Sequence, residues 1–143
     1  MYQRIVHATD LQQDHYAMCE QAKKFADFHH AQLYLMHVIE IPSALIIAQN
    51  LGFTELLAPA KEDAKLVLQT IAESLSLPKS HLYTEIGTVK HHILARAEAL
   101  KADLIILGRH SSHGLPTLLG STTYHVMQHA HCDVLTLSAK ANG

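Results

Sequence analysis

The chain has 143 residues, of which 48% are hydrophobic and 17% are charged, and its formal net charge at pH 7 is −2. This length and composition are typical of one folded globular domain and exclude a disordered chain. The small negative charge excludes a general electrostatic attraction to nucleic acid or to an anionic membrane surface.

No membrane anchor or secretory signal is visible in the sequence. No apolar run approaches the roughly 20 residues that a helix needs to span a bilayer, and strand-like sequence begins at once. The two cysteines, Cys19 and Cys132, show no paired spacing, which favours small buried apolar residues in a reducing compartment over a disulfide or zinc framework. We therefore expect one cytoplasmic domain over residues 1–143, with no membrane or nucleic-acid partner.

Strand-like and helix-like patterns alternate along the chain. Short β-favouring runs predict strands, and apolar residues that recur every three or four positions predict helices. Proline and glycine interrupt residues 40–59, which are expected to form a loop with a helical turn. In chain order the sequence predicts a strand over 2–9, a helix over 13–29, a strand over 33–39, the irregular segment 40–59, a helix over 60–76, a strand over 81–86, a helix over 89–100, a strand over 104–107, a helix from 120 and a strand over 133–138.

This alternation predicts an α/β fold with an open, five-stranded, mainly parallel sheet and helices on both faces. Right-handed crossovers place the carboxyl ends of the first, second and fourth strands along one edge of the sheet. Ligands bind at that edge, where the strand order reverses. We therefore expect Asp10, the His37–Val38 end of the second strand and Gly108 to converge.

The stretch from the fourth strand to the next helix has the features of a phosphate site. Gly108 is expected to end the apolar run, because a residue without a side chain lets a ligand or a sharp turn approach the backbone. The segment 120–123 (Gly-Ser-Thr-Thr) opens a helix. Its hydroxyls can cap that helix, and its free N–H groups favour an anion. Two plainer interpretations stay open: a simple helix start here, and a helix-capping role for Asp10.

The last third of the chain carries the strongest motif: Gly108, then Gly120–Ser121, then the run 129–135 into the terminal strand. With these residues the chain resembles small single-domain bacterial universal stress proteins. Nucleotide-binding members of that family carry Gly-x2-Gly-x9-Gly-Ser/Thr. Here the second glycine is replaced by Ser111, and 11 residues rather than 12 separate the outer glycines. Supporting matches are residues 5–10, residues 36–38 and Gly87.

The resemblance implies an adenine nucleotide alpha hydrolase-like, Rossmann-like fold that binds ATP or a related adenine nucleotide, with Mg²⁺ as a candidate companion ion. It implies that Asp10 accepts hydrogen bonds from the ribose and that the Val38 backbone meets the adenine edge. The residues expected at the nucleotide are Ala8, Asp10, Val38, Leu107, Gly108, Arg109, Ser111, Gly120, Ser121, Thr122 and Thr123. Arg109, His110 and His113 are expected to add charge near the phosphates.

The resemblance also implies a stress-response module that acts through ligand-linked changes of its surface or assembly. We expect a homodimer through the terminal strand 133–138, because unpaired edge groups favour strand pairing across a twofold axis. No phosphate-binding lysine motif, catalytic triad or carboxylate pair is visible, so no catalytic residue is expected. Two alternatives stay open: a nucleotide-free interaction protein whose altered loop closes the site, and a slow ATPase.

Thirteen histidines raise the possibility of a metal site. His125 and His129 are four residues apart, a spacing that places two imidazoles on one face of a helix. No acidic or cysteine third ligand is spaced with them, so solvated or capping histidines are the better interpretation. His7 and His37 fall inside strand segments and are expected to be neutral, hydrogen-bonded residues of the core or its edge.

Overall fold

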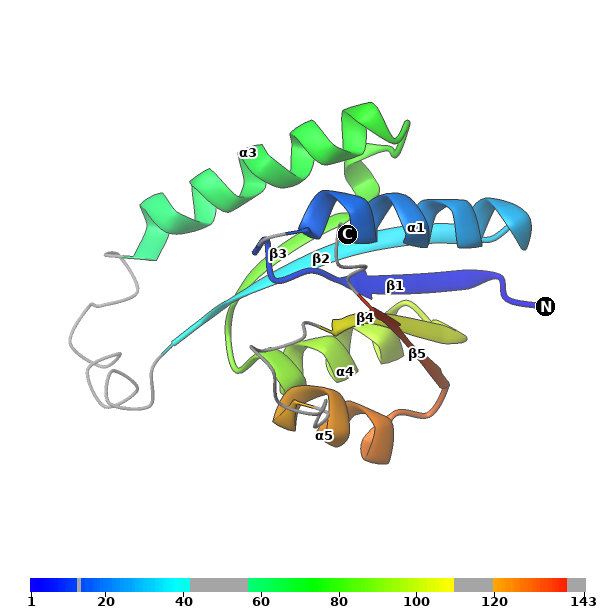
Figure 1. The fold of residues 1–143 in the computed structure, drawn as a ribbon. Coiled ribbons are helices and arrows are strands. Elements are labelled where there is room, and N and C mark those ends of the chain that lie inside the picture. Colours follow the sequence, from blue (N-terminus) through cyan, green and yellow to red (C-terminus); the bar gives the residue numbers. More distant parts are fainter. Residues whose placement is uncertain (13, 42–56, 110–119, 139–143) are drawn as a thin grey trace.

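A computed structural model describes residues 1–12, 14–41, 57–109 and 120–138 (Figure 1). Five strands form one sheet in the order β3-β2-β1-β4-β5, and all four neighbouring pairs are parallel. The elements are β1 (Arg4–Ala8), α1 (His15–Phe28), β2 (Gln32–Glu40), α3 (Ala58–Ser74), η3 (Lys79–His81), β3 (Leu82–Gly87), α4 (Val89–Ala99), β4 (Leu104–Arg109), α5 (Ser121–His129) and β5 (Asp133–Ser138). The predicted fold class is confirmed, with a sheet that is parallel throughout.

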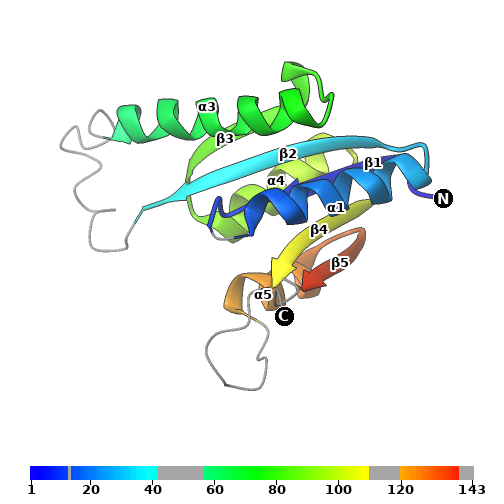
Figure 2. The same ribbon diagram turned by 45° about the horizontal axis from the view of Figure 1, so that its top comes forward.

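Helices cover both faces of the sheet. Helices α1 and α3 lie on one face, and α4 and α5 lie on the other (Figures 1 and 2). Helix α3 packs on β3 and β2, while α1 lies over β2, β1 and β4. No helix among the described residues combines the length and the apolarity that a membrane span requires.

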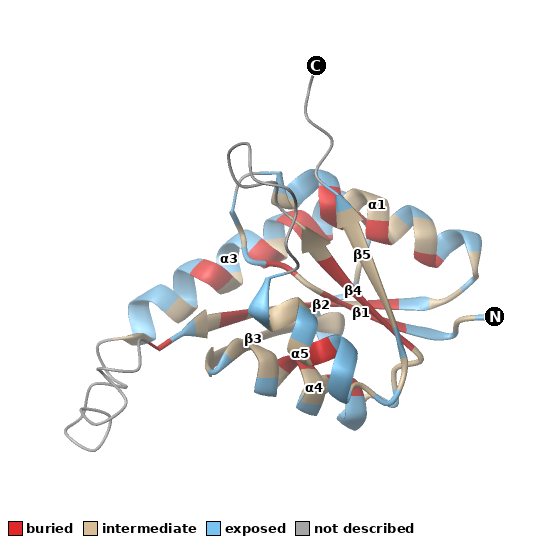
Figure 3. Ribbon diagram, turned by 60° about the horizontal axis from the view of Figure 1, so that its bottom comes forward, coloured by how far each residue is buried: buried red, intermediate tan, exposed pale blue. Residues whose placement is uncertain are grey.

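The apolar core is divided by the sheet into two clusters. One joins side chains of β1, β2 and β4 to α1 and α3, and the other joins the alternate side chains of the same strands to α4 and α5. The inner strand β4 is buried on both faces over Leu104–Leu107 (Figure 3), as its continuous apolar run predicts. The sheet is therefore anchored at β1 and β4, whose carboxyl ends begin the candidate site.

Two local predictions were wrong. Gly108 does not end the fourth strand, because β4 continues to Arg109 and Gly108 pairs in register with Leu137 of β5. Pro59 does not lie in an irregular segment, because α3 begins at Ala58 and takes the proline into its first turn. A proline is accepted there since the first N–H groups of a helix have no partner within it. Residues 42–56, the greater part of the predicted irregular segment, lie outside the described residues.

A partly buried ionic network joins the edge strand β3 to α4. The Glu85 carboxylate accepts hydrogen bonds from His92 Nδ1 at 2.5 Å and from the Arg96 guanidinium, and Arg96 also lies 4.0 Å from the centre of the Tyr83 ring. Burial by itself raises the pKa of Glu85, but the hydrogen bonds from Arg96 and His92 outweigh it and hold the pKa below its usual value. This network fixes the start of α4 beside the end of β3.

Candidate functional site

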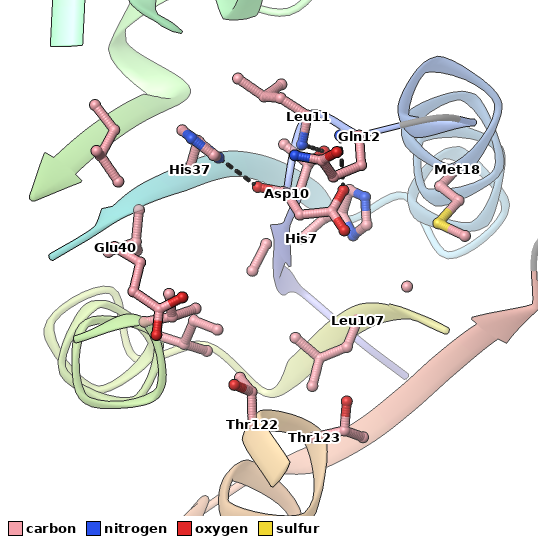
Figure 4. A pocket seen from close by; sticks show the side chains of 17 residues that line it. His7, Asp10, Leu11, Gln12, Met18, His37, Glu40, Leu107, Thr122 and Thr123 are labelled. Atoms are coloured by element: carbon pink, nitrogen blue, oxygen red, sulfur yellow. Dashed lines mark hydrogen bonds between the residues drawn. The ribbon is translucent and has the colours of Figure 1, made fainter. Parts of the chain in front are cut away.

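A cleft of about 580 Å³ opens at the carboxyl ends of the parallel strands (Figure 4). This volume is within the usual range of small-molecule sites. The cleft lies at the end of β1, where the strand order reverses, with β2 on one side of β1 and β4 on the other. Its lining residues are His7, Ala8, Thr9, Asp10, Leu11, Gln12, Met18, His37, Val38, Ile39, Glu40, Val89, Ile93, Leu107, Gly108, Thr122 and Thr123. The predicted convergence of Asp10, His37–Val38 and Gly108 is confirmed.

The segment after β1 forms a tight polar turn on one side of the cleft. Asp10 Oδ1 accepts a hydrogen bond from the Gln12 N–H at 2.9 Å, and Thr9 Oγ1 accepts one from the Leu11 N–H at 3.2 Å. Helix α1 begins later, at His15, with Asp14 as its N-cap residue. The alternative in which Asp10 caps the first helix was therefore wrong. Its carboxylate is held on the cleft wall (Figure 4).

The end of β2 supplies two polar residues: His37, which belongs to the predicted convergence but not to the predicted nucleotide-binding residues, and Glu40, which belongs to neither. His37 Nδ1 donates a hydrogen bond to the Thr9 carbonyl at 2.8 Å, which ties β2 to the turn after β1. Glu40, the last residue of β2, lies across the cleft from Met18, near the start of α4 (Figure 4). The sequence signal for Glu40 was an acidic residue directly after an apolar strand, but it fell at the start of the segment expected to be irregular.

Gly108 serves close packing in this structure. A Cβ atom at this position would lie 2.3 Å from the sulfur of Met18, which comes from α1. Met18 is 4% exposed and forms the cleft wall beside β4. The space beside Gly108, where a ligand was predicted to approach the backbone, is therefore filled by the thioether of Met18. The rest of the described cleft is open.

The first turn of α5 closes the cleft opposite Asp10. Thr122 and Thr123 line the cleft (Figure 4). Gly120 is the N-cap residue, and no described side chain makes a capping hydrogen bond. The hydroxyl cap that the sequence allowed is therefore not formed among the described residues, and the first N–H groups of α5, which have no partner within the helix, can bind another acceptor.

The structure does not bring every predicted residue to the cleft. The Arg109 guanidinium donates a hydrogen bond to Ser138 Oγ of β5 at 2.9 Å. Arg109, Gly120 and Ser121 are not among the lining residues. Ser111, with its neighbours His110 and His113, lies outside the described residues.

His7 is a buried imidazole at the bottom of the cleft. It is 1% exposed, and its Nδ1 donates a hydrogen bond to the Ile106 carbonyl at 2.9 Å. Burial lowers the pKa of this imidazole, so the ring is neutral at pH 7, as predicted. Its Nε2 atom has no hydrogen-bond partner among the residues that the structure describes. A neutral ring with hydrogen on Nδ1 leaves Nε2 as a buried acceptor.

Both cysteines pack against the apolar core, and His125 stacks on His129. Cys19 is fully buried, and burial raises the pKa of its thiol to about 12; Cys132 is half-buried, and both are free. The His125 and His129 rings stack at 4.1 Å between centroids. Across the described ranges, no group of three or more histidine, cysteine, aspartate or glutamate side chains is placed to hold a metal ion.

The sequence profile of the universal stress protein family matches residues 1–138. The chain belongs to this family. It is 36% identical over 129 residues to universal stress protein A homolog 2 of Coxiella burnetii, which covers 87% of this chain and 86% of the relative.

Solved structures show the same fold. The hypothetical protein MJ0577, the subject of a structure-based assignment of biochemical function, superimposes with a TM-score of 0.77 at 26% identity, covering 100% of this chain and 99% of that one. A universal stress protein in complex with cAMP superimposes with a TM-score of 0.63 at 22% identity, covering 95% of this chain and 97% of that one. The architecture around the cleft is therefore that of universal stress proteins.

Proposed function

We propose that this universal stress protein is a cytoplasmic module that binds ATP or a related adenine nucleotide in the cleft at the carboxyl ends of the strands. One domain over residues 1–143 forms the module. The convergence of Asp10, Val38 and the first turn of α5 around one open cleft carries this proposal. It is the arrangement that an adenine nucleotide requires, with an acceptor for the ribose, a strand edge for the base and free N–H groups for a phosphate. The cAMP complex, at low identity, supports the proposal only at the level of the shared fold.

Each part of the nucleotide has its own residues in the proposal. Asp10 accepts hydrogen bonds from the ribose, and the Val38 backbone meets the adenine edge. The phosphates lie against the start of α5, near Gly120, Ser121 and Thr122, with Mg²⁺ as a companion ion. Charge-assisted hydrogen bonds contribute about 1.5–3 kcal/mol each, so three or four of them support a micromolar Kd after the cost of association.

The module acts by binding rather than by catalysis. The described cleft wall has no lysine or arginine to stabilise a leaving phosphate, and His7 is neutral because burial lowers its pKa. The altered loop that would close the site in the nucleotide-free alternative, residues 110–119, lies outside the described residues. An enzymatic role requires phosphate release that disappears in a folded Asp10→Ala variant.

Assembly through β5 completes the proposal. β5 is an edge strand whose outer side has no strand partner within the described sheet, and such an edge favours pairing with a second copy. Arg109 ties the end of β4, beside the cleft, to Ser138 of β5. Through this contact, a ligand bound in the cleft is expected to affect β5, the strand at which the dimer is proposed to form. Sedimentation equilibrium with and without ATP and Mg²⁺ tests it, and a monomer in both conditions contradicts the dimer.

The experiment that tests the nucleotide role compares two ligands. Asp10→Ala is expected to weaken binding of ATP with Mg²⁺ about tenfold, because one or two hydrogen bonds to the ribose are lost. Binding of inorganic triphosphate with Mg²⁺ should change little, since that ligand has no ribose. Isothermal titration calorimetry measures both affinities. If Asp10→Ala weakens the binding of both ligands equally, Asp10 shapes the turn rather than binding the ribose. If the wild-type protein does not bind ATP, the proposed function is wrong.

A further inference from the structure

The described wall of the cleft contains carboxylates but no lysine or arginine. Asp10 and Glu40 are its acidic residues. At the ends of β4 and β5, the Arg109 guanidinium donates a hydrogen bond to Ser138, and Arg109 does not line the cleft. The described part of the wall therefore carries negative charge.

The histidines of the described wall do not reverse this balance. His7 is neutral because burial lowers its pKa, and its buried Nε2 is an acceptor without a partner in the described part of the chain. His37 directs its Nδ1–H to the Thr9 carbonyl. The described polar wall is thus rich in acceptors, which suits the hydroxyl and amino groups of a nucleoside better than a chain of phosphates.

The start of α5 is the electropositive element of this wall. A helix N-terminus is equivalent to about half a positive charge, and Thr122 and Thr123 add hydroxyl donors beside it. This set of groups matches one phosphate. A single phosphate carries about −1.5 to −2 at pH 7, and every further phosphate adds about one more negative charge. The additional charges of a triphosphate have no matching cation among the lining residues.

We propose that the cleft selects its adenosine ligand by charge: it binds a nucleoside monophosphate more tightly than a metal-free triphosphate, and Glu40 sets much of this preference. The inference rests on the proposed function, because it concerns the ligand of the same cleft. Groups around a cleft of this size lie within about one Debye length of a bound ligand, about 10 Å at 0.1 M ionic strength. At that range one carboxylate lowers the affinity for the extra phosphates by about three- to tenfold.

Calorimetry with three ligands tests the preference on the full chain. Adenosine, AMP and ATP are titrated in EDTA, and ATP is then titrated with Mg²⁺. In EDTA, the affinity for AMP is expected to be at least about tenfold higher than the affinity for ATP. Adding Mg²⁺ should restore most of the affinity for ATP. Raising the NaCl concentration should reduce the difference in affinity between AMP and metal-free ATP, because salt screens electrostatic repulsion and leaves the shape of the cleft unchanged. Equal or tighter binding of metal-free ATP overturns the inference, whereas no binding of any adenosine ligand overturns the proposed function instead.

A pair of variants assigns the preference to Glu40. Glu40→Gln is expected to raise the affinity for ATP in EDTA by about three- to tenfold and not to raise the affinity for adenosine, which carries no phosphate. Glu73→Gln is the matched control, because Glu73 is exposed near the end of α3, away from the lining residues, and its loss changes the net charge equally. The same gain in both variants, or a gain for adenosine as large as that for ATP, contradicts the role of Glu40.

Discussion

At the scale of the residue, Met18 and Gly108 share one space at the wall of the cleft. The thioether fills the position that a side chain on residue 108 would need. Because methionine is flexible, it can move when that position is filled, at a moderate cost. The glycine is therefore explained by a contact with α1, a tertiary feature that its place after an apolar run does not reveal.

A double-mutant cycle tests this shared space. Gly108→Ala is expected to lower the free energy of unfolding by about 1 kcal/mol, because the new methyl displaces the Met18 thioether from its packed position. In a Met18→Ala background the same change should cost close to nothing, since the colliding atoms are gone. Urea denaturation of the four proteins measures both costs. An equal penalty in the two backgrounds contradicts the contact.

Gly120 offers a variant that separates binding from folding. A Cβ atom there meets no atom of the described residues within 4 Å, and φ is −59°, so Gly120→Ala is expected to fit the fold with at most a small loss of N-cap stability. We expect Gly120→Ala to change the melting temperature by no more than a few degrees. Gly120→Val is expected to abolish the rise in melting temperature that ATP and Mg²⁺ cause. Differential scanning fluorimetry measures both. A normal ATP shift in the valine variant contradicts phosphate binding beside Gly120.

His125 gives the protein a defined response to acid. Partial desolvation lowers the pKa of this imidazole from 6.5, and basic neighbours lower it further. These neighbours are His129, Lys90 and His91. Because the folded pKa lies below the unfolded one, the unfolded state binds the proton more readily, and stability is lost as the pH falls below about 6.5. His125→Gln should reduce the slope of stability against pH between 7 and 5.5, as measured by urea denaturation, and an unchanged slope contradicts the assignment.

At the scale of the element, the edge strand β3 depends on its ionic contact with α4. The Glu85 side chain is 19% exposed, so its hydrogen bonds to Arg96 and His92 are partly shielded from water. Gly87 follows in a conformation with φ of +153°, and a side chain there would meet the His92 ring. The network thus fixes the turn that leads into Val89 and the cleft.

Removing the Glu85 charge measures the strength of this network. Glu85→Gln is expected to lower the free energy of unfolding by about 1–3 kcal/mol at pH 7, since Arg96 loses its charged partner. The pKa of Glu85 is lowered in the folded protein, so its contribution is present above pH 4.5 and is lost as the pH falls through its folded value. The two proteins should therefore converge in acid. The control is Glu62→Gln, because the exposed Glu62–Lys65 pair is expected to contribute less than about 1 kcal/mol; equal losses for both variants contradict the account.

At the scale of the whole molecule, the alternation of strands and helices was sufficient to predict the sheet and the edge at which the cleft opens. Apolar runs such as Leu104–Leu107 specify buried parallel strands, and the right-handed crossover rule then brings Asp10, Val38 and Gly108 to one cleft. Contacts between distant elements were beyond the sequence. The pairing of Gly108 with Leu137, the hydrogen bond of Arg109 to Ser138 and the place of Glu40 on the wall all depend on how the strands align.

The most direct test of the central claim is a titration of the ¹⁵N-labelled protein with AMP, followed by NMR. We expect the amide signals of residues 9–12, 38–40, 107–109 and 120–123 to shift together with one Kd, because they surround one cleft. A second cavity of about 370 Å³, lined by Lys101, Ala102, Ala130, His131 and Cys132 among others, serves as the internal control. Shifts confined to that cavity, or no shifts at millimolar AMP, contradict a nucleotide site at the carboxyl ends of the strands.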